Sequence, residues 1–404
     1  MSDWGGFAWG EDAAADGDGG GGAAAVEAGG AGGSAVAGGS DGVREQAARP
    51  SRKRMRRIGG GPYSTPVMRD LLPTPDSVVD PASRSPRIGS FRGGLPRVDW
   101  SPLQRGAAGT AVSLLRHKRW VYAAVATESV YIAVAVVRLG YASNAFLYVY
   151  DANERRMLAR RSWVGGPTAA RVGDTAGAGC EATFRAQGAF IAVERPRGST
   201  EYAVLAEAPG LSLHACLDAA DAPPAIGAVA EVAPGRFNAT EKRALLAARG
   251  SLRVDDEEIS LDGGLGGYDF TSGLLARRTR WHWGFALGRL VGGEPFGLNL
   301  VQGFVGEAEC AAWVGKELFG LGEGRFAFDR ARPEAPWRVR TADDAVDLTM
   351  TPGAAHEEHR ELLVVRSRFV HPCGAWTGTL TLPGREPLRV EHALGATEDQ
   401  DMTW

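Results

Sequence analysis

The octapeptide LSLHACLD, residues 211–218, alternates apolar and polar side chains. In an extended chain Leu211, Leu213, Ala215 and Leu217 share one face, and the residues between them share the other. This period of two is typical of a half-buried antiparallel strand. The stretch therefore predicts β structure near the middle of the chain.

Short segments of the same kind recur on both sides of this octapeptide, from about residue 113 onward. Those before it are RWVYAAVA, VYIAVAVV, FLYVYD, EATFRA, FIAVE and EYAVLAEA. Those after it are FGLNLVQGF, CAAWV, GRFAFD, PWRVR, VDLTMT, ELLVVRSRFV, GAWTGTLTL and PLRVEHAL. Turn residues such as Pro383 and Gly384 separate them. Many short strands with regular turns indicate an all-β sandwich or barrel.

One segment has the pattern of a helix instead. Residues 238–241, NATE, match a capping box, the run KRALLAA continues the pattern, and Gly250 can end it. We therefore expect a short helix there, among otherwise β structure.

An internal repeat indicates a duplication. KRWVY at residues 118–122 is followed by Gly140, and TRWHW at residues 279–283 is followed by Gly303. Each copy then runs through an aromatic segment to a polar turn. Chance similarity between two β segments is the alternative, but the repeat favours two consecutive β-barrel-like domains.

The organisation of the chain follows from these patterns and from composition. Residues 1–60 are rich in Gly, Ala and Asp, which predicts a disordered tail. Residues 61–112 are rich in Pro, Ser and Arg, which predicts an extended segment packing on the folded body. The first β domain is expected over residues 113–236. The second, introduced by the short helix, is expected over residues 237–404.

A dense basic run lies near the end of the tail. It consists of Arg52, Lys53, Arg54, Arg56 and Arg57. Such a run on a flexible tail is typical of a nuclear import signal, so the import machinery is an expected partner. A solvated linker, or a run that neutralises the acidic first half of the tail, are the alternatives.

The bulk properties exclude some classes of protein. The formal net charge of -3 gives no basic footprint for specific nucleic-acid binding. No apolar run reaches the roughly 18 residues of a transmembrane helix, and the N-terminus does not resemble a secretory signal. Four widely spaced cysteines are then expected to be reduced thiols. These features predict an intracellular protein of the cytoplasm or nucleus.

The stretch RTRWHWGFALG, residues 278–288, is the first candidate binding region. As a strand it places Trp281 and Trp283 on an apolar face, with Arg278, His282 and small residues on the other. The tryptophans could be ordinary core residues, or one face could line a cavity. The sequence does not decide which face that would be.

Tyr268 and Asp269, between glycines just upstream, form the second candidate region. A carboxyl group beside aromatic rings could act as a general acid because desolvation favours its protonated form. A turn aspartate that bonds to the local backbone is the alternative.

A series of motifs then gives a resemblance. The motifs are GYDFxxG with Tyr268 and Asp269, RRTRWxW with Trp281 and Trp283, GLNLxxGF with Asn299, WRV at 337–339, GxWxG at 374–378, and GxxE ending at Glu398 before Trp404. In this order the chain resembles, from about Pro62 to Trp404, an uncharacterised family catalogued as domain of unknown function 2804. That family is more distantly similar to the bacterial carotenoid hydratase and attachment-protein-like group.

The resemblance implies a fold and a chemistry. The relatives have two consecutive lipocalin-like antiparallel β-barrels, which agrees with the duplication. The hydratase adds water across an isoprenoid double bond by acid catalysis and without a cofactor. Carried over, Asp269 would be the general acid. The residues that would bind the ligand are Arg278, Tyr268, Trp281, His282, Trp283 and Asn299.

Other chemistries have weak signals in the sequence. His356 and His359 frame HEEH, which lacks the spacing of a zinc-binding helix and follows Pro-Gly, so we interpret it as a solvated loop and expect no metal. No nucleophile elbow, phosphate-binding loop or dinucleotide fingerprint occurs in context. No cofactor is expected.

Three functions remain open at this point. The first is a non-catalytic binder of a hydrophobic small molecule such as a lipid or isoprenoid. The second is a cofactor-free hydratase or isomerase acting on such a molecule. The third is an interaction scaffold without a ligand cavity.

Overall fold

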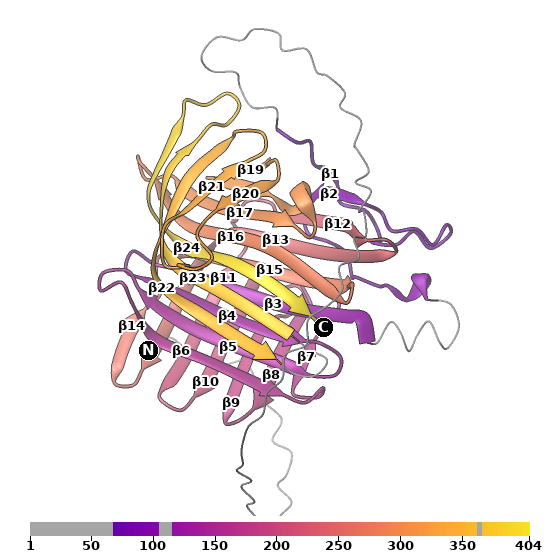
Figure 1. Cartoon of the computed structure of the whole chain (residues 1–404), viewed down its shortest axis with the longest axis horizontal. Helices are drawn as coiled ribbons and strands as arrows, with labels where there is room; N and C mark the ends of the chain where they lie inside the picture. Colours follow the sequence, from indigo (N-terminus) through magenta and orange to yellow (C-terminus); the bar gives the residue numbers. More distant parts are fainter. Residues whose placement is uncertain (1–67, 105–114, 362–365) are drawn as a thin grey trace, which may run out of the picture. The chain divides into compact units, whose positions relative to one another are not determined.

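The computed structural model describes residues 68–104, 115–361 and 366–404 (Figure 1). Most of these residues are in strands, with turns and the short 3₁₀ helices η1 (Ser101–Leu103) and η2 (Gly306–Glu309) between them. The all-β prediction is confirmed. No helix in these ranges is long and apolar enough to cross a membrane. The predictions for residues 1–60 lie outside the described residues, and so does the basic run.

The first sheet contains 15 strands, 11 of them in the order β6-β5-β4-β3-β15-β13-β11-β10-β9-β8-β7. Neighbours along this order are antiparallel, and β7 packs back against β3 and β4, so the sheet curls toward closure. The strands are β3 (His117–Ala126), β4 (Val130–Arg138), β5 (Ser143–Asp151), β6 (Arg156–Gly165), β7 (Ala170–Val172), β8 (Cys180–Ala186), β9 (Ala189–Arg195), β10 (Glu201–Ala208), β11 (Leu211–Asp218), β13 (Arg236–Val254) and β15 (Gly264–Leu274).

Four further strands attach at the side of this path. They are β1 (Leu72–Pro73), β2 (Gly89–Arg92), β12 (Ile226–Ala233) and β14 (Glu257–Ser260). β2 pairs with β12, so the Pro- and Arg-rich segment adds to the sheet over its described part.

The second sheet contains nine strands in the order β19-β18-β17-β16-β24-β23-β22-β21-β20. All its pairs are antiparallel, and β20 lies against β17, so this sheet also curls. The strands are β16 (Arg278–Leu290), β17 (Pro295–Gly303), β18 (Ala311–Val314), β19 (Glu317–Gly320), β20 (Gly324–Ala327), β21 (Trp337–Thr341), β22 (Val346–Glu361), β23 (Arg366–Leu380) and β24 (Leu388–Thr403).

The predicted helix at residues 238–250 is wrong. This segment lies inside β13, which pairs with β11, β12, β14 and β15. The hydroxyl of Thr240, expected inside the capping box, instead donates to the carbonyl of Phe270 across the sheet. Helix propensity is worth a few tenths of a kcal/mol per residue, and strand pairing along both edges outweighs it here.

Because of β13, the boundary between the two sheets lies later in the chain than the boundary placed from the sequence. β13, β14 and β15 all pair within the first sheet, so the change of sheet falls between Leu274 and Arg278. The sequence placed the start of the second half at residue 237, inside what proves to be one continuous strand.

The two sheets pack face to face through β3, β4 and β5, which are buried on both sides. Alternate residues such as Val134 belong to the core of the first sheet, and those between them, such as Ala133, join the core shared with the second sheet. β22 packs against β6 and β24 against β4 (Figure 1). The repeated Trp residues meet at this junction, where the rings of Trp120 and Trp281 stack with centroids 6.1 Å apart.

Candidate functional site

A cavity of about 420 Å³ lies between the two sheets. Its wall is mainly apolar, and nine aromatic side chains in it come from the strands of both sheets and from the residues beside them. These are Trp120, Tyr122, Tyr141, Phe146, Trp281, Trp283, Phe304, Phe369 and Trp404. Tyr141 and Val164, which are 37% and 40% exposed, lie at the side open to solvent.

Strand alternation decides which residues of β16 and β24 face this cavity. Trp281 and Trp283 face it from β16, and Glu398, Gln400 and Met402 face it from β24. The tryptophan face is therefore the one that lines a cavity. On the opposite face the small residues of β16 adjoin large rings of the second sheet: a methyl group added to Gly284 would lie 2.9 Å from the ring of Trp376.

Asp269 lines the cavity, but it is already paired. Its Oδ2 lies 2.7 Å from Nζ of Lys242, which is 3.5 Å from Oε1 of Glu309. Burial alone would lower the pKa of Lys242, but the two carboxyl groups outweigh burial and raise it. Burial also raises the pKa of Glu309, against the opposing effect of Lys242. The cavity thus has one end at which a charged lysine is held between two acidic side chains.

Glu398 is a further buried carboxyl group near Lys242 and Asp269. Its Oε1 accepts a 2.7 Å hydrogen bond from Nε1 of Trp281. Burial raises its pKa to about 8, a shift that the bond from Trp281 and the charge of Lys242 reduce and the charge of Asp269 increases. At neutral pH Glu398 is therefore mostly protonated and can donate a proton into the cavity.

Asn299 holds one of the two tryptophans in place. Its Oδ1 accepts a 2.8 Å hydrogen bond from Nε1 of Trp283, and its Nδ2 donates to the backbone carbonyl of Glu309. It is fully buried behind the cavity wall. Asn299 therefore supports the site rather than lining the cavity.

Tyr268 lies on the other face of β15 from Asp269. It is fully buried in the core of the first sheet, where its hydroxyl lies 3.1 Å from Sγ of Cys180 and its ring packs on Tyr202. Because neighbours on a strand point to opposite faces, Tyr268 cannot share the cavity with Asp269.

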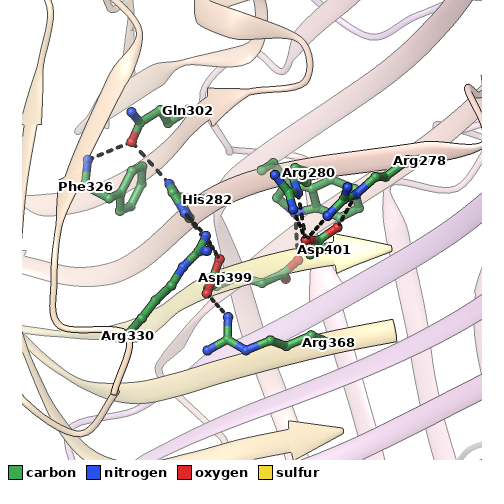
Figure 2. A network of polar contacts seen from close by, with 11 residues as sticks. Arg278, Arg280, His282, Gln302, Phe326, Arg330, Arg368, Asp399 and Asp401 are labelled. Atoms are coloured by element: carbon green, nitrogen blue, oxygen red, sulfur yellow. Dashed lines mark hydrogen bonds and ion pairs between the residues drawn. The ribbon is translucent and has the colours of Figure 1, made fainter. Parts of the chain in front are cut away.

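His282 also lies away from the cavity, in a polar network around Asp399 (Figure 2). Asp399 is 1% exposed and accepts hydrogen bonds from Arg330, at 3.0 Å, and from Arg368. Nε2 of His282 is 3.3 Å from the same carboxyl group. Burial would raise the pKa of Asp399, but the bonds from His282 and Arg368 and the charge of Arg330 outweigh it and lower the pKa.

Arg278 belongs to a neighbouring surface cluster. Its guanidinium makes two hydrogen bonds of 2.9 and 2.8 Å to Asp401, which also accepts one from Arg280 (Figure 2). Both arginine side chains are more than half exposed. Arg278 therefore does not contact the cavity.

Several polar residues of the cavity were not predicted as site residues, among them Lys242, Glu309, Glu398 and Gln400. Glu398 was recognised only as part of a motif. The C-terminal sequence TEDQDMTW carried a usable signal, since alternate residues from Glu398 onward would share one face of a strand. Lys242 was missed because its segment was interpreted as a helix.

The HEEH segment is not a solvated loop, which corrects the sequence-based interpretation. It lies in β22, and His356 is buried against Phe146 and Tyr148. His359, three residues on, falls on the opposite, exposed face. Within the described ranges, no group of three or more His, Cys, Asp or Glu side chains is arranged to hold a metal ion.

Comparison with known proteins gives one family. A family model described as Domain of unknown function (DUF2804) matches residues 72–404. No curated protein matches the chain.

Several solved structures are similar at low identity. Kievitone hydratase from Nectria haematococca is 13% identical over 70% of this chain and 88% of its own, with a TM-score of 0.46. A putative AttH from Nitrosomonas europaea is 15% identical over 70% and 92%, with a TM-score of 0.44. CghA with Sch210972 is 14% identical over 81% and 97%, with a TM-score of 0.49.

Proposed function

The chain belongs to the family of domain of unknown function 2804, and we propose that it binds a mostly apolar small molecule, such as a lipid or an isoprenoid, between its two sheets. The observation that carries this proposal is the cavity of about 420 Å³ with its aromatic wall. Ligand sites are typically concave, largely apolar and furnished with a few polar groups. The cavity has this composition, and Lys242 and Glu398 are among its polar groups.

Filling the cavity should abolish binding. Ala135 is buried and lines the cavity from β4, so in the Ala135→Phe variant the larger ring would occupy ligand space. We expect at least about a tenfold loss of affinity for an apolar probe such as geraniol, equivalent to roughly 1.4 kcal/mol. Quenching of the cavity tryptophans measures binding, and thermal melting checks the fold.

A matched control adds the same ring elsewhere. Val291 is 58% exposed in a turn and does not line the cavity, so Val291→Phe should bind the probe like the wild type. Unchanged binding by a folded Ala135→Phe variant would contradict this location for the site.

A second candidate function is acid catalysis on the bound molecule, favoured by the protonated Glu398. Glu398 would give its proton to one carbon of an isoprenoid double bond, leaving a carbocation beside Trp281 and Trp283. Aromatic faces stabilise cations. Water would then add to the cation and lose a proton, which returns to Glu398, giving hydration; loss of a neighbouring proton instead gives isomerisation. Asp269 was the general acid expected from the sequence, but in the structure its carboxyl group is engaged by Nζ of Lys242 at 2.7 Å.

Proton transfer can be followed directly with a simple terpene. In deuterated water the wild type is expected to place deuterium on myrcene, and Glu398→Gln should reduce incorporation by about 10²- to 10⁴-fold while binding the terpene normally. Mass spectrometry reads incorporation, and tryptophan quenching reads binding. Equal incorporation by the two proteins would show that Glu398 is not the acid.

The scaffold function and nuclear import by residues 52–57 remain separate proposals. The scaffold alternative was an interaction protein without a ligand cavity, so binding of the probe in the titration above would contradict it.

A further inference from the structure

The cavity offers no available positive charge to a ligand. Among the described residues that line it, Lys242 is the one cation, and it is 3% exposed. Its ammonium group already contacts Asp269 at 2.7 Å and Glu309 at 3.5 Å. A carboxylate or phosphate head group would therefore meet acidic side chains without a free cation to pair with.

The cavity wall also contains an unsatisfied acceptor. Gln400 is 5% exposed and lines the cavity, and its Oε1 is buried without a hydrogen-bond partner. A buried acceptor that has lost its water is unfavourable unless a donor replaces it. A donor on the ligand would supply that bond.

A donor lies on the same strand face, two residues away. Oε1 of Glu398 accepts from Trp281, which leaves the proton of the neutral carboxyl group on Oε2. Oε2 is 3.8 Å from Nδ1 of His371, too far for a hydrogen bond. Burial keeps the pKa of Glu398 near 8, so at pH 7 it donates rather than attracts a cation.

We propose that the ligand is uncharged and carries a hydroxyl group, which donates to Gln400 and accepts from Glu398 at the carboxyl-rich end of the cavity. This rests on the proposed ligand-binding function and specifies its substrate class. A hydroxyl group both donates and accepts, so it satisfies both side chains at once. An ammonium group has no acceptor for the proton of Glu398, and a carboxylate has no donor for Gln400.

Four probes with the same chain separate these head groups. Octanol, octanoic acid, octylamine and octane are titrated at pH 7 against the full-length protein by tryptophan quenching. Octanol is expected to bind about tenfold more tightly than each of the others, as one or two added hydrogen bonds predict. Tighter or equal binding of octanoic acid, octylamine or octane overturns the proposal. Failure of all four to bind overturns the proposed function, and the proposal with it.

Variants of β24 test the residue assignment. Gln400→Met keeps the length of the side chain but removes the acceptor, and should weaken octanol binding about five- to tenfold while leaving octane binding unchanged. Asp401→Asn, next to Gln400 but on the opposite face of β24 and outside the cavity wall, is the control and should change neither. Glu398→Gln retains a donor and should keep most of the affinity for octanol. An equal loss of affinity for octanol and octane in Gln400→Met would contradict the assignment of Gln400 as the acceptor. If that variant does not fold, the comparison of the four probes on the wild type still decides the ligand class.

Discussion

Glu398→Gln is expected to stabilise the folded protein by roughly 3 to 5 kcal/mol above pH 8, because each unit of pKa difference between folded and unfolded states corresponds to about 1.4 kcal/mol. Near pH 5 the gain should be small. The glutamine side chain has the shape of the protonated acid and cannot ionise. It therefore avoids the cost of a carboxylate that burial disfavours.

The direction of this pH dependence follows from the raised pKa. Folding holds the proton of Glu398 up to about pH 8, whereas the ordinary value is 4.5. Its contribution is fully present below pH 4.5, declines as the pH rises, and is lost as the pH passes about 8. Burial is the main cause of the raised pKa. The bond from Trp281 on β16 and the charge of Lys242 on β13 oppose it, and the charges of Asp269 on β15 and Asp399 on β24 add to it. Nδ1 of His371 on β23 also faces Glu398, at 3.8 Å.

Urea denaturation at pH 5, 7 and 9 measures the effect as the difference in the free energy of unfolding between the Glu398→Gln variant and the wild type. That difference isolates Glu398 because every other titrating group is common to both proteins. Glu386→Gln, an exposed change in the turn before β24, is the control and should leave the difference near zero. Parallel pH profiles for the wild type and Glu398→Gln would contradict a protonated Glu398.

The fold was largely predictable because alternation along a strand is a local property. LSLHACLD was identified as a strand from its own residues, and β11 has those bounds. The helix prediction for residues 238–250 was wrong for the converse reason. Their capping residues and helix formers are also local signals, whereas the pairing that makes them β13 comes from distant strands.

The site was predictable only where a single strand carried the information. Trp281 and Trp283 were placed on one face correctly, and that face lines the cavity. Tyr268 could have been separated from Asp269 by the same alternation. The charges around Asp269 come from β13 and η2, which the chain brings together only through the packing of two sheets. A single sequence does not contain that register.

Asp399→Asn should be strongly destabilising, with an expected loss of about 2 to 4 kcal/mol. Asp399 is 1% exposed, and its carboxyl group compensates the charges of Arg330 and Arg368 and lies 3.3 Å from Nε2 of His282 (Figure 2). Asparagine has nearly the same shape but no charge, so the cations are left facing one another. Because both arginines are partly exposed, water screens them, and the expected loss is below that of a fully buried pair.

Asp401→Asn is the matched control, since it makes the same change two residues along β24. Asp401 pairs with Arg278 and Arg280, whose side chains are more than half exposed, so the expected loss is at most about 1 kcal/mol.

The lowered pKa of Asp399 also makes its contribution to stability depend on pH. Its stabilising contribution is present above the ordinary value of 3.8 and is lost as the pH falls through the lower folded value. The gap between wild type and Asp399→Asn in urea denaturation should therefore be widest at neutral pH and shrink in acid. Equal losses for the two variants at pH 7 would mean that the burial of Asp399, which is what distinguishes it from Asp401, contributes nothing to the stability of this network.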